Sequence, residues 1–260
     1  MNASPPAIPT TLPEAAYDEG FAPVGRRIGL IALSTDLVAE RAFGSIVERG
    51  GANYFTTRIR YIPSSELAGS HDEEEQDIAR AAAVLLPEAG IDVLAFCCTS
   101  RSAENGERET IDFLEKLRPG IACTTPLTAA AEALRALGIR RLGLVSPYLL
   151  VGHNAVQRAL GDLGFEVVRS ACFNLALGSQ FARLTTAAIA DAARSVAAGG
   201  GIDGIFISCA GIRSIPAIET LERETGLPVV TSAQTMAWHS LRLLGQPSAP
   251  EQPGSLFLVA

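Results

Sequence analysis

The sequence of 260 residues lacks the features that mark several classes of protein. Basic residues are fewer than acidic ones, 21 against 28, and a net charge of -7 leaves no basic surface of the kind that binds nucleic acid. No uninterrupted apolar run approaches the length of a membrane-spanning helix. Residues 1–24 hold five prolines but no basic start or apolar stretch, so we expect a flexible tail and not a secretory signal. These absences predict no nucleic-acid partner and no membrane contact.

Cysteine is present, but without the spacing of a disulfide framework or a zinc site. The five cysteines are an odd number, and the chain has neither a Cys-x-x-Cys pair nor a Cys/His cluster. We therefore expect reduced thiols, a cytoplasmic protein and no metal site. The run Gly199–Gly201 lacks the lysine of a phosphate-binding loop and precedes a predicted strand, which indicates an ordinary loop.

The sequence does contain an alternation of buried strands and helices. Hydrophobic residues make up 48% of the chain, enough for a compact core. A continuous apolar run over 26–33 predicts a buried strand, residues 38–49 predict a helix, and 54–61 predict a second strand. The alternation continues along the chain and predicts an α/β fold of mostly parallel sheets flanked by helices.

The second half of the sequence repeats the plan of the first. Three segments match three later ones in the same order, at offsets of 114, 111 and 107 residues: 26–31 with 140–145, 91–100 with 202–211, and 123–138 with 230–245. Strand–helix–strand units also resemble one another without duplication, so the shared order is what favours a duplicated lobe.

We interpret the repeat as two pseudo-symmetric α/β lobes with a cleft between them. The first lobe is predicted over residues 25–127 and the second over 128–232. Residues 233–260 are predicted to form a C-terminal helix and tail that pack back on the first lobe.

The repeat places two cysteines at matching strand ends. Cys98 and Cys209 each follow a short apolar run, and ligands of parallel α/β sheets bind at the carboxyl ends of strands. If the lobes face each other, the two thiols reach one cleft from opposite sides. One thiolate can then remove an α-proton while the other thiol supplies one, or one can add to an activated double bond while the other donates a proton. Both reactions need no cofactor.

The remaining cysteines do not share this placement. A single cysteine more often packs in a core than takes part in catalysis. We assign Cys97, Cys123 and Cys172 to packing, and strand alternation predicts that Cys97 points away from Cys98.

Four short motifs support a family resemblance that covers residues 26 to about 245. They are 33–40 after the first strand, 98–100, 146–148 after the repeated first strand, and 208–213. With the paired strand-end cysteines, they resemble the aspartate/glutamate racemase superfamily. Within it the chain looks most like the branch of maleate cis-trans isomerases, arylmalonate decarboxylases and racemase-like proteins of ectoine utilisation.

The resemblance implies roles for individual residues and a homodimer. Cys98 matches the cysteine that acts as nucleophile or base, and Cys209 matches the proton donor. Tyr148 is similar to a tyrosine that contacts a substrate carboxylate. The other substrate-binding residues that we predict lie in the turn after the first strand, beside the two cysteines, and in one later segment: Ser34, Asp36, Thr99, Ser100, Ala210, Gly211 and Asn174.

Two positions bear on the choice of reaction. Decarboxylases of this branch lack the first cysteine, so Cys98 argues against simple decarboxylation. Maleate isomerases typically carry an asparagine where this chain has Asp36. A carboxylate there would repel a dicarboxylate unless protonated or paired, and would suit an amino group. Asp36 could equally do no more than cap the following helix.

We therefore predict a cofactor-independent isomerase that acts on a small carboxylate in the manner of a maleate isomerase. The alternatives are a racemase of aspartate, glutamate or a diamino acid, and a non-catalytic protein that binds a small carboxylate.

Overall fold

The computed structural model describes residues 11, 13–16, 25–62, 71–87, 89–246 and 251–259. Most of the predicted flexible tail, residues 1–24, lies outside the described residues.

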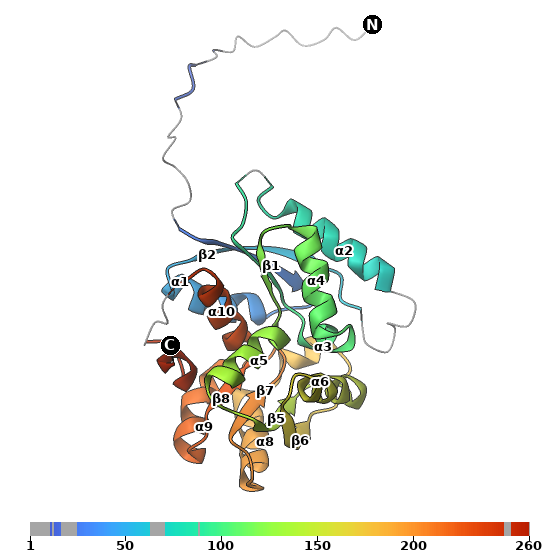
Figure 1. The fold of residues 1–260 in the computed structure, drawn as a ribbon, viewed down its shortest axis with the longest axis vertical. Helices are drawn as coiled ribbons and strands as arrows, with labels where there is room; N and C mark the ends of the chain where they lie inside the picture. Colours follow the sequence, from blue (N-terminus) through green and yellow to red (C-terminus); the bar gives the residue numbers. More distant parts are fainter. Residues whose placement is uncertain are drawn as a thin grey trace, which may run out of the picture.

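Two parallel four-stranded sheets form the framework (Figure 1). The first has the order β2-β1-β3-β4, with β1 Arg27–Leu33, β2 Asn53–Ile59, β3 Val93–Phe96 and β4 Ala122–Thr124. The second has the order β6-β5-β7-β8, with β5 Arg141–Ser146, β6 Glu166–Cys172, β7 Gly204–Ile207 and β8 Val229–Thr231. Within each half the strands follow the same order, which confirms the predicted α/β fold with mostly parallel sheets.

Helices connect the strands in both halves. The first half has α1 Ala39–Arg49, α2 His71–Val84, α3 Thr99–Glu104, α4 Glu107–Leu117 and α5 Pro126–Ala136. The second has α6 Leu150–Asp162, α7 Gly178–Phe181, α8 Thr186–Ala198, α9 Ile218–Thr225 and α10 Ser232–Leu243, with short 3₁₀ turns at Ile215–Ala217 and Ser255–Leu258.

Glycines at equivalent places in the two central strands let other side chains approach closely. A Cβ atom on Gly29 of β1 would lie 2.7 Å from the Ile91 side chain. One on Gly143 of β5 would lie 2.2 Å from Val196 and 3.1 Å from Ile202. Because Ile91 and Ile202 match under the repeat, both halves use the same local packing, and any larger residue at these glycines would force a shift.

Aspartates that match under the repeat fix the start of each central strand. The Asp92 carboxylate accepts a hydrogen bond from the Arg27 amide at 2.8 Å, and the Asp203 carboxylate accepts one from the Arg141 amide at 2.9 Å. The hydrogen bond from the Arg141 amide, with a second one from the Arg140 amide, holds the pKa of Asp203 below its ordinary value. The repeated aspartates therefore have a structural role.

The two halves share one interior. A single hydrophobic cluster includes Ile28 and Leu30 of β1 together with Leu144 of β5 and Val230 of β8. Helices α5 and α10 pack against each other, and α10 also packs against α1 (Figure 1). The Gln252 side chain donates to the Ile46 carbonyl at 3.1 Å, so the segment after α10 also reaches α1. The lobe boundaries stay a prediction.

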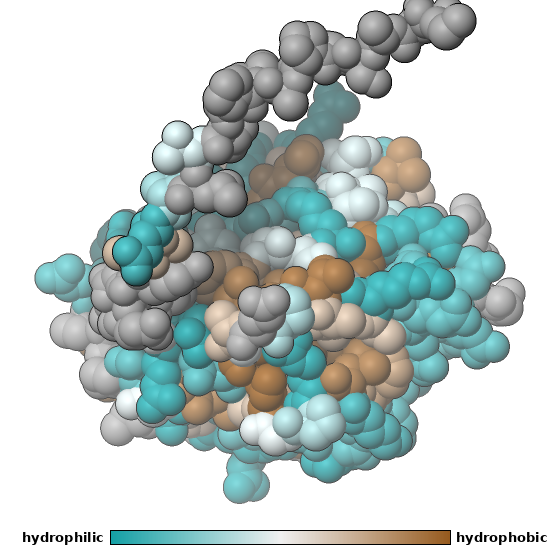
Figure 2. All heavy atoms as spheres, turned by 90° about the horizontal axis from the view of Figure 1, so that it is seen from above, coloured by the Kyte–Doolittle hydropathy of each residue, from teal (hydrophilic) through white to brown (hydrophobic). Residues whose placement is uncertain are grey.

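The surface shown in Figure 2 is hydrophilic over most of its margin, with hydrophobic residues gathered in smaller patches nearer the middle. Among the described residues, no helix is both long and apolar enough to cross a membrane.

Candidate active site

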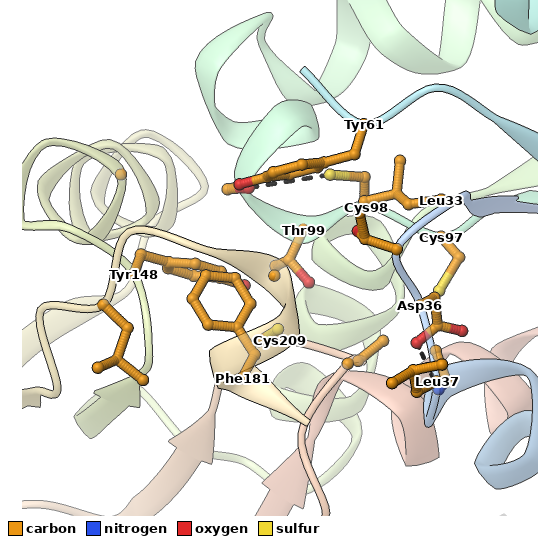
Figure 3. Close-up of a pocket in the computed structure, with 18 of the residues that line it drawn as sticks. Leu33, Asp36, Leu37, Tyr61, Cys97, Cys98, Thr99, Tyr148, Phe181 and Cys209 are labelled. Carbon is orange, nitrogen blue, oxygen red and sulfur yellow. Dashed lines mark hydrogen bonds between the residues drawn. The ribbon is translucent and has the colours of Figure 1, made fainter. Parts of the chain in front are cut away.

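One pocket lies where the carboxyl ends of strands from both sheets meet (Figure 3). Segments that follow β1, β3, β5 and β7 contribute to its wall, as expected where the loops of parallel sheets converge. It holds about 800 Å³ of empty space, part of which is open to solvent. Most of the predicted site residues line it: Asp36, Cys98, Thr99, Ser100, Tyr148, Cys209, Ala210 and Gly211.

The two predicted thiols therefore reach the same pocket from different halves of the molecule. Cys98 comes directly before α3, whereas Cys209 comes two residues after β7. Cys209 has a φ of 94°, a backbone conformation that costs a residue other than glycine about 1–3 kcal/mol. Such strain persists only where the surroundings fix the turn.

One buried serine joins the two cysteine turns. The Ser232 hydroxyl oxygen, at the start of α10, accepts a hydrogen bond from the Cys209 amide at 2.9 Å. The same oxygen accepts one from the Thr99 hydroxyl at 3.1 Å. Figure 3 shows Thr99 between Cys98 and Cys209 in this view. Ser232 thus fixes the strained turn at Cys209 relative to the residue after Cys98.

Tyr148 closes the pocket on the side of the second half. Its hydroxyl lies 3.3 Å from the Ser208 hydroxyl, and its ring packs edge-on against Phe181 with centroids 5.9 Å apart. Burial, followed by the nearby Cys209 thiol, raises the pKa of Tyr148 well above its ordinary value. The hydroxyl therefore stays protonated and can donate a hydrogen bond to a carboxylate.

Burial also favours the protonated form of both thiols. It raises the pKa of Cys98 to about 11, against the opposing effect of the Arg101 charge and backbone amide. It raises the pKa of Cys209 to about 12, against hydrogen bonds from the Gly211 amide and the Tyr148 hydroxyl.

Tyr61 is a wall residue that the sequence analysis missed. It lies two residues after β2, and its ring faces the Cys98 side chain in Figure 3. Burial and then the Cys98 thiol raise its pKa to about 12. Its position at the carboxyl end of a predicted parallel strand was a signal that could have indicated this residue.

Asp36 satisfies the free amides at the start of α1 while it faces the pocket. One carboxylate oxygen accepts from the Val38 and Ala39 amides at 3.0 and 2.9 Å, and the other accepts from the Glu40 amide at 3.1 Å. Asp36 therefore caps α1, as one interpretation of the sequence expected. It also lies in the pocket, where a carboxylate that contacts the substrate would have to be.

Cys97 was expected to be a core residue only, but it also lines the pocket. It is buried in the shared core, with its sulfur drawn beside Asp36 and away from the Cys98 sulfur in Figure 3. Strand β3 ends at Phe96, so strand alternation does not govern the direction of the next two side chains.

Two predicted residues are not in the pocket lining. The Ser34 hydroxyl accepts a hydrogen bond from the Tyr61 amide at 3.2 Å, which supports the segment that carries the tyrosine. The Asn174 side chain accepts one from the Leu150 amide at 3.2 Å, and Asn174 has a φ of 52°, so it serves the start of α6. Both side chains accept hydrogen bonds from backbone amides, and their contact with a substrate stays a prediction.

The rest of the lining is apolar or uncharged. Leu33, Leu149, Leu175 and Phe181 contribute apolar surface, and none of the described lining residues is Lys, Arg or His. A carboxylate here would be held by hydroxyl and backbone N–H donors. Across the described parts of the chain, no group of three or more His, Cys, Asp or Glu side chains could hold a metal ion.

Comparison with known proteins shows the family to which the chain belongs. The family model for arylmalonate decarboxylase matches residues 67–257. An arylmalonate decarboxylase of Bordetella bronchiseptica is 33% identical over 175 residues, which cover 65% of this chain and 71% of that protein. A maleate isomerase of Nocardia farcinica is 28% identical over 244 residues, covering 89% of this chain and 95% of the relative.

A solved structure agrees over almost the same length. It is a cysteine-to-serine mutant of the Nocardia farcinica maleate cis-trans isomerase with a covalently bound succinylcysteine intermediate. It matches with a TM-score of 0.80 at 25% identity, covering 89% of this chain and 98% of the other. The relatives are enzymes, isomerase and decarboxylase, and the chain belongs to the arylmalonate decarboxylase family.

Proposed function

We propose that this protein is a cofactor-independent isomerase of a small carboxylate, acting like a maleate cis-trans isomerase. The observation that carries the proposal is that Cys98 and Cys209, from equivalent strand ends of the two halves, line one pocket. The succinylcysteine found in a structural relative supports a covalent role for one cysteine. A homodimer in the cytoplasm remains part of the expectation.

The two thiols would divide the reaction between them. The Cys98 thiol first loses its proton to solvent, and the thiolate then adds to one alkene carbon of a maleate-like acid and forms a C–S bond, while the π electrons move toward the adjacent carboxylate. The Cys209 thiol then protonates the other carbon, which leaves a single bond about which the intermediate rotates. Cys209 takes a proton back, the double bond re-forms in the trans geometry, and Cys98 leaves as the thiolate.

Neutral donors would hold the charge that develops on the carboxylate. Thr99, Ser100 and Tyr148 have hydroxyl groups in the pocket lining. Ala210 and Gly211 also line the pocket and would contribute backbone N–H donors. Fixed donors in a pocket with little water stabilise developing negative charge more strongly than water does.

Asp36 favours a second candidate, a racemase of an amino acid. Its carboxylate faces the pocket and could receive a substrate ammonium group. In that reaction one thiolate removes the α-proton and the opposite thiol returns one to the other face of the carbon.

One experiment separates these reactions. The purified protein is incubated in deuterated water with maleate, phenylmalonate, aspartate, glutamate and a diamino acid, and products are followed by nuclear magnetic resonance. Fumarate from maleate supports the isomerase, α-deuterium in an amino acid supports the racemase, and loss of carbon dioxide from phenylmalonate supports a decarboxylase.

The cysteine variants test the mechanism on whichever acid is accepted. Cys98→Ser and Cys209→Ser should each reduce turnover by at least about a hundredfold, the usual scale of one acid–base group. Full turnover by either variant would reject the two-thiol mechanism. Tight binding of an acid without any turnover by the unmodified protein would instead indicate a binding protein.

A further inference from the structure

A buried ion cluster lies directly behind the Cys98 turn, outside the pocket lining. Arg101 of α3 exposes 4% of its side chain and Glu74 of α2 exposes 3%. The Arg101 Nε donates to the Glu74 carboxylate at 2.8 Å, and a terminal nitrogen donates to Glu104 at 3.1 Å. Well-packed apolar residues are often as stabilising as a buried ion pair. The charges at this place therefore point to a role other than stability.

The cluster connects two walls of the pocket. The second terminal nitrogen of Arg101 donates to the Ile62 carbonyl at 2.9 Å, and Ile62 follows Tyr61. The Arg101 backbone amide faces the Cys98 sulfur. Arg101 thus joins the turn that carries the thiol, the segment that carries Tyr61, and α2.

The two charges of the pair act on the thiol in opposite directions. Burial dominates the pKa of Cys98 and raises it, the positive charge of Arg101 lowers it, and the negative charge of Glu74 raises it. Burial in turn raises the pKa of Glu74, against the effect of Arg101. The other titratable groups facing Cys98 or this pair are Tyr61, Cys97, Tyr148, Cys209, Glu104 and His71.

We propose that the Arg101–Glu74 pair is a positioning device that sets the reactivity of the Cys98 thiol. Arg101 favours the thiolate, and Glu74 holds the guanidinium in place while it opposes that effect. The inference rests on Cys98 being the reactive thiol of the proposed isomerase, but the chemistry of the thiol alone can test it.

The test measures how fast iodoacetamide alkylates Cys98 from about pH 6 to about pH 10, below the pKa of about 11 of this thiol. In this range the rate at each pH is proportional to the thiolate fraction and so reports the midpoint of the titration. Tandem mass spectrometry assigns the label to Cys98 and not to the adjacent Cys97. Arg101→Met should move the midpoint of the profile upward, and Glu74→Gln should move it downward. Each shift should be about 0.5–1 pH unit, a three- to tenfold change in thiolate fraction.

The opposite signs distinguish this role from a structural one, because loosening of the fold would expose Cys98 and speed alkylation in both variants. Shifts of the same sign, or no shift, would overturn the inference. If Arg101→Met does not fold, Arg101→Lys replaces it, because it keeps the positive charge but loses the hydrogen bonds to Glu104 and Ile62. The midpoint should then stay unchanged in Arg101→Lys and fall in Glu74→Gln, whereas a fall in both variants, as loosening would give, overturns the inference. Arg80→Met, which removes an exposed charge from α2, should leave the profile unchanged.

The outcomes also separate this inference from the proposed function. Opposite shifts in a protein that converts none of the acids would support the electrostatic role and reject the isomerase. Shifts of one sign in a protein that isomerises maleate would reject only the role of the pair.

Discussion

Replacing Ser232 with alanine should uncouple the two cysteine turns. The Cys209 amide is buried and would lose its acceptor, which costs about 1–3 kcal/mol for an unsatisfied donor. The Thr99 hydroxyl would lose its partner as well, at about 0.5–1.5 kcal/mol for a neutral hydrogen bond. We expect the free energy of unfolding to fall by about 1.5–4.5 kcal/mol, the sum of these two effects. The strained Cys209 backbone should also relax without this hydrogen bond, which would move the thiol and reduce turnover.

The assay compares urea unfolding of Ser232→Ala with that of Ser240→Ala. Ser240 is buried in the same helix, but its hydroxyl donates to the Met236 carbonyl at 2.8 Å, within the helix, and leaves no amide unsatisfied when removed. Ser240→Ala should therefore cost less than about 1 kcal/mol. Equal losses for the two variants, or an unchanged turnover of folded Ser232→Ala, would refute the argument that Ser232 holds the turns together.

Two other predictions concern pH and packing. The thiols of Cys98 and Cys209 have a pKa of about 8.5 in the unfolded chain, but burial raises their pKa values to about 11 and about 12 in the folded protein. The free energy of unfolding should therefore fall as pH rises above about 8.5. Urea unfolding near neutrality and at alkaline pH checks the sign, and a more stable protein at alkaline pH would contradict it. Gly29→Ala should lower the free energy of unfolding by about 1–3 kcal/mol through overpacking. Gly161→Ala, on the open surface of α6, should raise it by about 0.5–1 kcal/mol. Thermal unfolding of both variants tests this, and equal effects would contradict the packing argument.

The sequence was enough to predict the fold class because its signals are local. Continuous apolar runs such as 26–33 predict buried parallel strands, and glycines such as Gly138 mark the ends of helices. Exact helix register was harder to predict. The repeat aligns Gly138 with Gly245 at an offset of 107, but the threonines that cap α5 and α10, Thr125 and Thr231, lie 106 residues apart. Helix α10 has one residue more than α5, which a repeat comparison alone does not reveal.

The contacts behind the site were beyond sequence reasoning because they join distant segments. Arg101 meets Glu74 across 27 residues, and Thr99 meets Ser232 across 133, without any spacing rule that connects them. The roles of the residues that match under the repeat also became clear only from their contacts in the structure.

Three positions are identical between segments 91–100 and 202–211, an isoleucine, an aspartate and a cysteine, but they serve different purposes. The isoleucines fill the space above Gly29 and Gly143, and the aspartates bind the amides at the start of β1 and β5. A duplicated framework can keep such residues for structural reasons alone, so a match under a repeat does not by itself indicate a site. Only the cysteines stand beyond the ends of their strands, where the halves meet. Their position at that edge, more than their repetition, makes Cys98 and Cys209 candidates for catalysis.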